Sequence, residues 1–179
     1  MSFSIAKTPS LKGKTALVTG GNIGLGFETV KALASKGAHV LLAARNDEKG
    51  KAAVAEVQKL IPNAQVELLR LDLASQRSIR AAASEVGNKF SQLDFLVNNA
   101  GIMAMPEMKT EDGFESQFGV NHLGHWSLTA LLMDNLKAAD AARVVTVTST
   151  AHHLIWNVNF DDPHMHKKYS AWNAYSQSK

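Results

Sequence analysis

Short apolar runs, each followed by a helical pattern, constrain the fold of this 179-residue chain more than any other feature. The apolar runs lie at residues 15–20, 39–44, 66–71, 94–99 and 143–149. Because they lack a regular polar face, they predict strands that are buried on both sides. Helical patterns occupy the segments between them, at 24–36, 47–60, 75–90 and 113–139. The alternation predicts an α/β fold, a doubly wound parallel sheet of the Rossmann type with helices on both faces.

Length and composition narrow the class further. The chain is long enough for a single domain over residues 1–179, and no linker or repeat divides it. The absence of cysteine excludes disulfides, thiolate catalysis and cysteine-ligated zinc, and it fits a cytoplasmic protein. Neither a signal peptide nor an apolar run of about 18 residues is present, so no membrane span is expected. The net charge of +3 comes from scattered basic residues, which does not predict nucleic-acid binding.

The segment TGGNIGLG, residues 19–26, connects the first predicted strand to the first predicted helix. Gly20, Gly24 and Gly26 do not have the spacing of the usual GxGxxG fingerprint, but the physical reasoning is the same. Glycine permits a tight turn and a close approach of phosphate, and the helix N-terminus offers free N–H groups and a positive dipole end. A purely structural turn would look similar. The position in the first strand–helix unit favours a dinucleotide site.

Arg45 directly follows the second predicted strand. In doubly wound folds this position faces the adenosine ribose, where an acidic residue binds a 2′-hydroxyl and an arginine accommodates a 2′-phosphate. The nearby acids, Asp47 and Glu48, come two and three residues later. The sequence therefore favours NADP(H) over NAD(H), with a surface role for Arg45 as the alternative.

Tyr175 and Lys179 are four residues apart, and on a helix they would share one face. A phenol has a free pKa of about 10, and a neighbouring ammonium favours its ionised form. Such a pair can exchange protons near neutral pH. Ser149 ends the fifth predicted strand, and α/β sites are built at strand ends. Each feature is weak alone, and the combination is what indicates a catalytic site.

These motifs, taken in order, resemble the short-chain dehydrogenase/reductase family over nearly the whole chain. The segments NNAGIMA, FGVNHLGHW and VTSTAHH are similar to its retinol-dehydrogenase-like branch. The resembling positions are Thr19-Gly20-x-x-x-Gly24-x-Gly26, Asp72-Leu73, Asn98-Asn99-Ala100-Gly101, Asn121, Ser149 and Tyr175-x-x-x-Lys179.

The resemblance implies hydride transfer between NADP(H) and a small carbonyl or alcohol substrate. Tyr175 would exchange a proton with the substrate oxygen, and Lys179 would assist it and bind the nicotinamide ribose. Ser149 would hydrogen-bond the substrate oxygen, and Asn121 would hold a water that links Lys179 to solvent. The residues expected to bind the cofactor are Gly20, Asn22, Ile23, Gly24, Gly26, Arg45, Asp72, Leu73, Asn99, Ala100, Gly101, Tyr175 and Lys179. Asp72 would meet the adenine amino group.

Members of this family continue beyond the lysine, so we expect this chain to be the N-terminal portion of a longer protein, with the C-terminal strands missing. An open sheet edge would invite association, so a homo-oligomer is compatible with the sequence. The alternative function is a non-catalytic dinucleotide-binding module, a sensor or scaffold that is inactive because it is truncated. The presence of Ser149, Tyr175 and Lys179 together favours an enzyme.

The long segment 151–172 leaves two smaller questions open. His164 and His166, with Asp161 and Asp162 nearby, could suggest a metal, but a convergent set of ligands is needed and we expect a polar loop without a metal. Trp156 and Trp172 either line a substrate pocket or pack the loop.

Overall fold

A parallel sheet forms the centre of the molecule. The computed structural model describes residues 4–155 and 157–179. Five strands lie in the order β3-β2-β1-β4-β5, and every neighbouring pair is parallel. Their bounds are β1 Thr15–Thr19, β2 His39–Ala44, β3 Val66–Arg70, β4 Phe95–Asn98 and β5 Arg143–Thr146. The predicted α/β fold with a doubly wound parallel sheet is confirmed.

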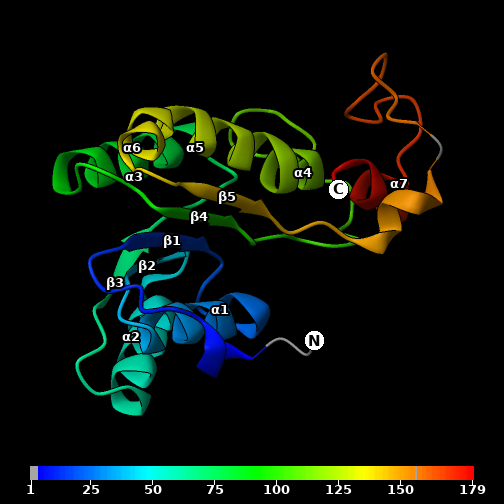
Figure 1. Cartoon of the computed structure of the whole chain (residues 1–179). Helices are drawn as coiled ribbons and strands as arrows, with labels where there is room; N and C mark the ends of the chain where they lie inside the picture. Colours follow the sequence, from blue (N-terminus) through cyan, green and yellow to red (C-terminus); the bar gives the residue numbers. More distant parts are fainter. Residues whose placement is uncertain (1–3, 156) are drawn as a thin grey trace.

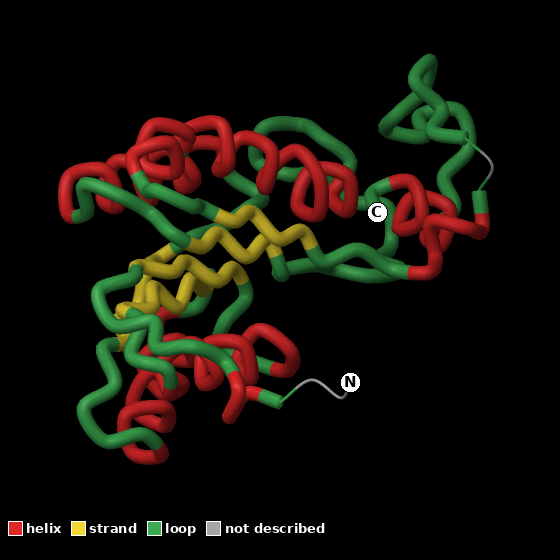
Figure 2. The backbone as a smooth tube through the Cα atoms, viewed as in Figure 1, coloured by secondary structure: helices red, strands yellow, loops and turns green. Residues whose placement is uncertain are grey.

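Helices cover the two faces of the sheet (Figure 1). One layer holds α1 and α2, and the other holds α3, α5 and α6, with the yellow strands of Figure 2 between the two red layers. A last helix, α7, lies at the end of the molecule where the chain stops. The bounds are α1 Gly24–Ser35, α2 Asp47–Leu60, α3 Gln76–Lys89, α5 His125–Leu131, α6 Met133–Ala138 and α7 Ala171–Gln177. A short 3-10 turn, η1 Ile5–Lys7, precedes β1.

Alternate residues of β1 face opposite layers. Leu17 belongs to the apolar cluster that includes Ile79 of α3 and Leu128 of α5. Val18 belongs to the second cluster, which includes Val30 of α1 and Val57 of α2. Both sides of β1 are therefore buried, which is why its sequence shows no polar face.

The long helix predicted at 113–139 is wrong in its start and in its continuity. The structure begins with a single turn, α4 Ser116–Phe118, and continues as a π-helix, η2 Gly119–Gly124, before α5. At Leu132 the backbone leaves the helical region, with φ −93° and ψ 6°, and α6 follows. A hydrophobic period cannot reveal this, because a π turn inserts one residue without interrupting the helix.

The fifth strand is shorter than predicted, and its burial was predicted wrongly. β5 ends at Thr146 rather than at 149, and its four residues are exposed. Ser149 instead caps a 3-10 helix, η3 Thr150–Leu154, with its Oγ accepting the N–H of Ala151 at 3.2 Å. The segment 151–172, in which we expected a polar loop, therefore starts with a helical turn. Trp156 lies outside the described residues.

Candidate active site

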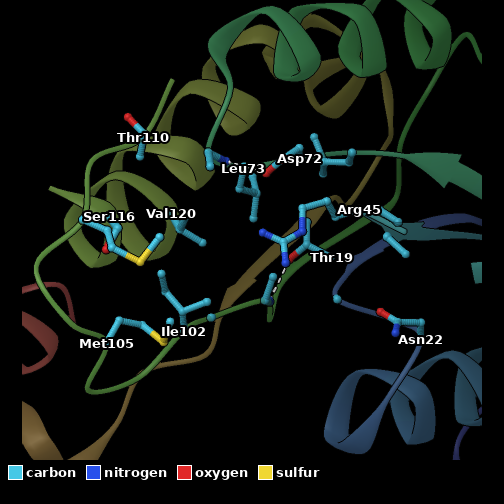
Figure 3. A pocket seen from close by; sticks show the side chains of 18 of the residues that line it. Thr19, Asn22, Arg45, Asp72, Leu73, Ile102, Met105, Thr110, Ser116 and Val120 are labelled. Carbon is cyan, nitrogen blue, oxygen red and sulfur yellow. Dashed lines mark hydrogen bonds between the residues drawn. The ribbon is translucent and has the colours of Figure 1, made fainter. Parts of the chain in front are cut away.

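A cavity of about 290 Å³ lies at the carboxyl ends of β1 to β4. This is where the strand order reverses, the position at which open α/β sheets bind ligands. Figure 3 shows side chains from four strand ends facing this space. Its lining includes Thr19, Gly20, Asn22, Ala43, Ala44, Arg45, Leu71, Asp72, Leu73, Ala74, Ala100, Gly101 and Ile102, and a second group of Met105, Met108, Lys109, Thr110, Ser116 and Val120.

The glycine turn brings the N-terminus of α1 to this cavity. Gly20 and Gly24 have φ angles of +63° and +59°, in the left-handed region that favours glycine. At Gly26 an added Cβ would lie 2.3 Å from the carbonyl oxygen of Gly20, so the backbone of the turn packs directly on the helix. The amide of Asn99 holds the same turn, with Nδ2 donating to the carbonyl of Thr19 at 2.9 Å.

The N-terminus of α1 differs from those of its neighbours. Side chains of Asn46, Ser75 and Ser170 cap α2, α3 and α7. Within the described part of the chain no side chain caps α1, and its first turn holds no acidic residue. Its N–H groups and dipole are thus free for an anion, and an added Cβ at Gly24 would meet nothing within 4 Å. These features fit the pyrophosphate of a dinucleotide.

Arg45 and Asp72 line the cavity from the ends of β2 and β3. Figure 3 shows the Arg45 side chain between Asp72 and Thr19. One oxygen of Asp72, Oδ1, accepts the N–H of Ala74 at 2.9 Å, which orients the carboxylate at the start of the turn into α3. An exposed arginine and a half-buried carboxylate therefore share one wall.

Tyr175 and Lys179 are brought together, but not on one helix as predicted. α7 ends at Gln177, and Lys179 lies just beyond its C-cap. The Nζ atom of Lys179 lies 6.0 Å from the centre of the Tyr175 ring and donates to the carbonyl of Val147 at 3.3 Å. Burial lowers the pKa of the Lys179 ammonium. At Gly101 an added Cβ would lie 3.2 Å from Nζ, so the missing side chain leaves room for the ammonium.

Asn121 is buried between the loop after β4 and the end of α7. Its Nδ2 donates to the carbonyl of Ile102 at 2.9 Å and to Ser178 Oγ at 2.8 Å. Its Oδ1 accepts the N–H of Ile102 at 2.9 Å. Both amide protons are therefore used, and Oδ1 keeps one free lone pair. The water expected at Asn121 stays a prediction.

Ser149 is half-buried at the start of η3. Among the residues that the structure describes, no hydrogen bond joins its hydroxyl to that of Tyr175. Beside Lys179 lies a second cavity of about 440 Å³. It is lined by Thr148, His152, Ile155, Asn157, Val158, Ser176, Gln177 and Lys179. Trp172 is 53% exposed and approaches the Tyr175 ring edge-on, with the ring centres 6.2 Å apart.

The expected cofactor residues divide into two groups. Gly20, Asn22, Arg45, Asp72, Leu73, Ala100 and Gly101 line the first cavity. The others are Ile23, Gly24, Gly26, Asn99, Tyr175 and Lys179, which are not part of that lining. The side chain of Ile23 is 75% exposed, and Asn99 supports the turn rather than facing the cavity. Sequence reasoning missed Thr19 and His125 as site residues, although both occupy motif segments.

The histidines of the long loop have structural partners. The Nδ1 atom of His164 accepts the N–H of Glu115 at 3.2 Å, and its ring stacks on Phe114. Among residues 4–155 and 157–179, no group of three or more His, Cys, Asp or Glu side chains could hold a metal ion. No helix in this described part of the chain is both long and apolar enough to cross a membrane.

Known proteins share this sequence and this fold. The family model for short chain dehydrogenases matches residues 14–160. Human retinol dehydrogenase 12 is 47% identical over 169 residues, which are 94% of this chain and 53% of that protein. An uncharacterized Mycobacterium paratuberculosis protein superposes with a TM-score of 0.86 at 44% identity, covering 100% of this chain and 62% of the other. For the Pseudomonas aeruginosa RhlG/NADP active-site complex the TM-score is 0.72 at 29% identity, with coverages of 94% and 62%.

The parallel sheet and the cavity at its switch point define a Rossmann-type α/β protein. More closely, the chain belongs to the short-chain dehydrogenase family and is similar to its retinol dehydrogenases. It spans about half the length of the curated relatives that it matches.

Proposed function

We propose that this chain supplies the dinucleotide-binding and proton-transfer parts of an oxidoreductase that moves a hydride between NADP(H) and a carbonyl or alcohol. One juxtaposition carries the proposal. Gly101 lines the cavity at the strand ends, and its missing Cβ leaves room for Lys179 Nζ, 3.2 Å from where that atom would lie. The proposed cofactor site and the proposed catalytic pair therefore meet at one residue.

The bound dinucleotide would supply the hydride, and the protein would supply position and a proton. The uncapped N-terminus of α1 would hold the pyrophosphate. Tyr175 would exchange the proton with the substrate oxygen, and the ammonium of Lys179 would favour the phenolate. Ser149 Oγ accepts the N–H of Ala151, which leaves its hydroxyl proton free to donate to the same oxygen. The cavity of about 440 Å³ beside Lys179 would take part of the substrate.

The preference for NADP(H) rests on charge. Arg45 and Lys109 both line the first cavity, and both can face a 2′-phosphate. The one acid in this lining, Asp72, follows β3 and not β2, so it is not placed to accept from the ribose 2′-hydroxyl at the end of β2. The solved structure of RhlG, which has a similar fold, is a complex with NADP, and this supports the proposed preference for NADP(H).

The alternative is a dinucleotide-binding module without turnover. The observation in its favour is that, among the described residues, no hydrogen bond joins the Ser149 hydroxyl to that of Tyr175. It predicts that the cofactor binds but that no carbonyl compound is reduced.

A binding and turnover experiment separates the two. NADPH and NADH are titrated into the protein, with nucleotide fluorescence and melting temperature as readouts, and NADPH consumption is then followed with a panel of aldehydes and ketones. We expect NADPH to bind more tightly than NADH and to be consumed. Binding without consumption supports the module, and binding of neither nucleotide contradicts both functions.

A further inference from the structure

A buried histidine connects the two parts of the candidate site. His125 is 4% exposed and begins α5, four residues after Asn121. Its Nε2 lies 2.8 Å from Thr19 Oγ1, at the end of β1. Its Nδ1 lies 2.9 Å from the carbonyl oxygen of Asn121. Each ring nitrogen thus contacts a different element of the site.

The hydrogen bonds around Thr19 determine which nitrogen carries the proton. Thr19 Oγ1 accepts the N–H groups of Asn99 and Ala100, both at 2.9 Å, so its lone pairs are used. Its single proton then goes to His125 Nε2 at 2.8 Å, because the carbonyl of Val97 is farther away at 3.4 Å. A nitrogen that accepts carries no proton, so the ring is neutral and protonated at Nδ1, which donates to Asn121.

His125 directly follows the π turn that contains Asn121. The backbone N–H of His125 bonds to the carbonyl of His122. In a regular α-helix it would bond to Asn121 instead. At this position the ring Nδ1 of His125 contacts the Asn121 carbonyl, whereas the backbone N–H of His125 bonds to His122. Single π turns within α-helices are frequent at functional sites.

The two partners of His125 hold opposite sides of the site. Thr19 fixes the backbone of Asn99 and Ala100 next to the glycine turn. Asn121 fixes Ile102 and, through Ser178, the end of α7, where Ser178 Oγ donates to the carbonyl of Tyr175 at 2.7 Å. One imidazole thus joins the nucleotide side to the helix that carries Tyr175.

We propose that His125 is a positioning residue whose neutral ring, protonated at Nδ1, sets the distance between the nucleotide cavity and the Tyr175–Lys179 pair. The inference rests on the proposed function. His125 lines neither cavity and donates no proton to substrate. It acts through Thr19 and Asn121, because a shift of either partner would move the reacting groups relative to one another.

Three substitutions separate this role from simple core packing. His125→Phe keeps the ring and removes both hydrogen bonds. His125→Asn places its amide donor near the Nδ1 position and loses the contact with Thr19, whereas His125→Gln reaches Thr19 with its amide. His122→Phe is the matched control, since His122 is exposed on the same turn and stacks on Phe118.

Amide hydrogen exchange is the first readout. The Ala100 N–H bonds to Thr19 Oγ1, and the Ile102 N–H bonds to Asn121 Oδ1. We expect His125→Asn to speed exchange at Ala100 by roughly tenfold and to spare Ile102, and His125→Gln to do the reverse. His125→Phe should affect both and weaken NADPH binding by roughly tenfold, whereas His122→Phe should affect neither.

The ring ¹⁵N spectrum of the wild-type protein needs no variant and reports the tautomer directly. An Nδ1–H ring supports the inference, and an Nε2–H ring overturns it. Identical exchange in the Asn and Gln variants, or unchanged NADPH binding in a folded His125→Phe protein, overturns it as well. Failure of the wild-type protein to bind any nicotinamide dinucleotide would overturn the proposed function, and the catalytic part of this inference with it.

Discussion

β4 and β5 are neighbours in the sheet, yet they lie in different environments. Leu96 and Val144 are partners in the parallel register of these strands. Leu96 is 0% exposed, because α3 and α5 cover it, whereas Val144 at the sheet edge is 46% exposed. Both residues look equally like core residues in the sequence. The difference teaches that an apolar run predicts a strand, whereas packing of neighbouring elements decides whether that strand is buried.

The two halves of the proposed site, the nucleotide side and the catalytic side, also differ in their burial and in how they are built. On the nucleotide side Thr19 is 0% exposed, and the glycine turn is held by backbone contacts. On the catalytic side Tyr175 and Lys179 are half-buried on and after the seven-residue helix α7. The nucleotide side is thus built mainly from backbone geometry, and the catalytic side from side chains at the end of short elements.

The largest expected effect tests the catalytic side. Tyr175→Phe removes the proposed acid–base hydroxyl and keeps the ring. General acid–base catalysis contributes roughly 10²–10⁴-fold, so turnover should fall by about that factor. NADPH should still bind, weakened at most by the loss of the one hydrogen bond that the Tyr175 hydroxyl could give it, about tenfold. Steady-state kinetics and nucleotide titration measure both quantities, and near-normal turnover would remove Tyr175 from the mechanism.

A pair of truncations tests the contrast between the strands. Leu96→Ala creates a cavity in the core and should lower the free energy of unfolding by about 2–5 kcal/mol. Val144→Ala, at the register partner, should cost about 0.5 kcal/mol or less, because the side chain is half exposed. Urea denaturation of the two variants measures the difference. Equal losses would mean that β5 is covered in solution.

The pH dependence of the free energy of unfolding tests His125, which connects the two halves of the site. Burial lowers the pKa of His125 from its ordinary 6.5 to about 4, with smaller contributions from Lys179 and His122. Between these values the unfolded chain binds a proton that the folded protein excludes, so stability is complete above pH 6.5 and falls as the pH drops towards 4. The loss should be about 3 kcal/mol.

The control variant is His125→Phe, which cannot take up this proton. Between pH 6.5 and 4 its free energy of unfolding should fall by about 3 kcal/mol less than that of the wild-type protein. Asp94 titrates in a separate window. Burial raises its pKa, but the hydrogen bonds from Lys14, the Thr15 N–H and Gln92 hold it below its ordinary 3.8. A wild-type and a variant profile that coincide would show that His125 is protonated in the folded protein.

The smallest effect concerns cofactor choice on the nucleotide side. Arg45→Asp should repel a 2′-phosphate and accept a hydrogen bond from a 2′-hydroxyl. A hydrogen bond to a charged group contributes about 1.5–3 kcal/mol, so the NADPH/NADH preference should shift by at least about tenfold towards NADH. The ratio of the two dissociation constants reports it. An unchanged ratio would place Arg45 outside the ribose site.

Much of the fold could be predicted because it depends on local patterns. The helices of the first half were predicted to within about a residue, since Asn46 and Ser75 are caps recognisable in sequence. The π turn at Gly119–Gly124 could not be predicted. It depends on close contacts of its glycines: an added Cβ on Gly124 would lie 2.6 Å from the carbonyl of Leu73, which is far away in sequence.

The sequence by itself determined the class of this protein. The alternation of strands and helices, the glycine turn and the order of Ser149, Tyr175 and Lys179 are all properties of short segments. Tertiary structure alone decided two other things: that Lys179 lies next to Gly101, and that His125 joins Thr19 to Asn121. The physical reason is that hydrogen bonds and burial depend on which distant groups meet, and Thr19 and His125 are 106 residues apart.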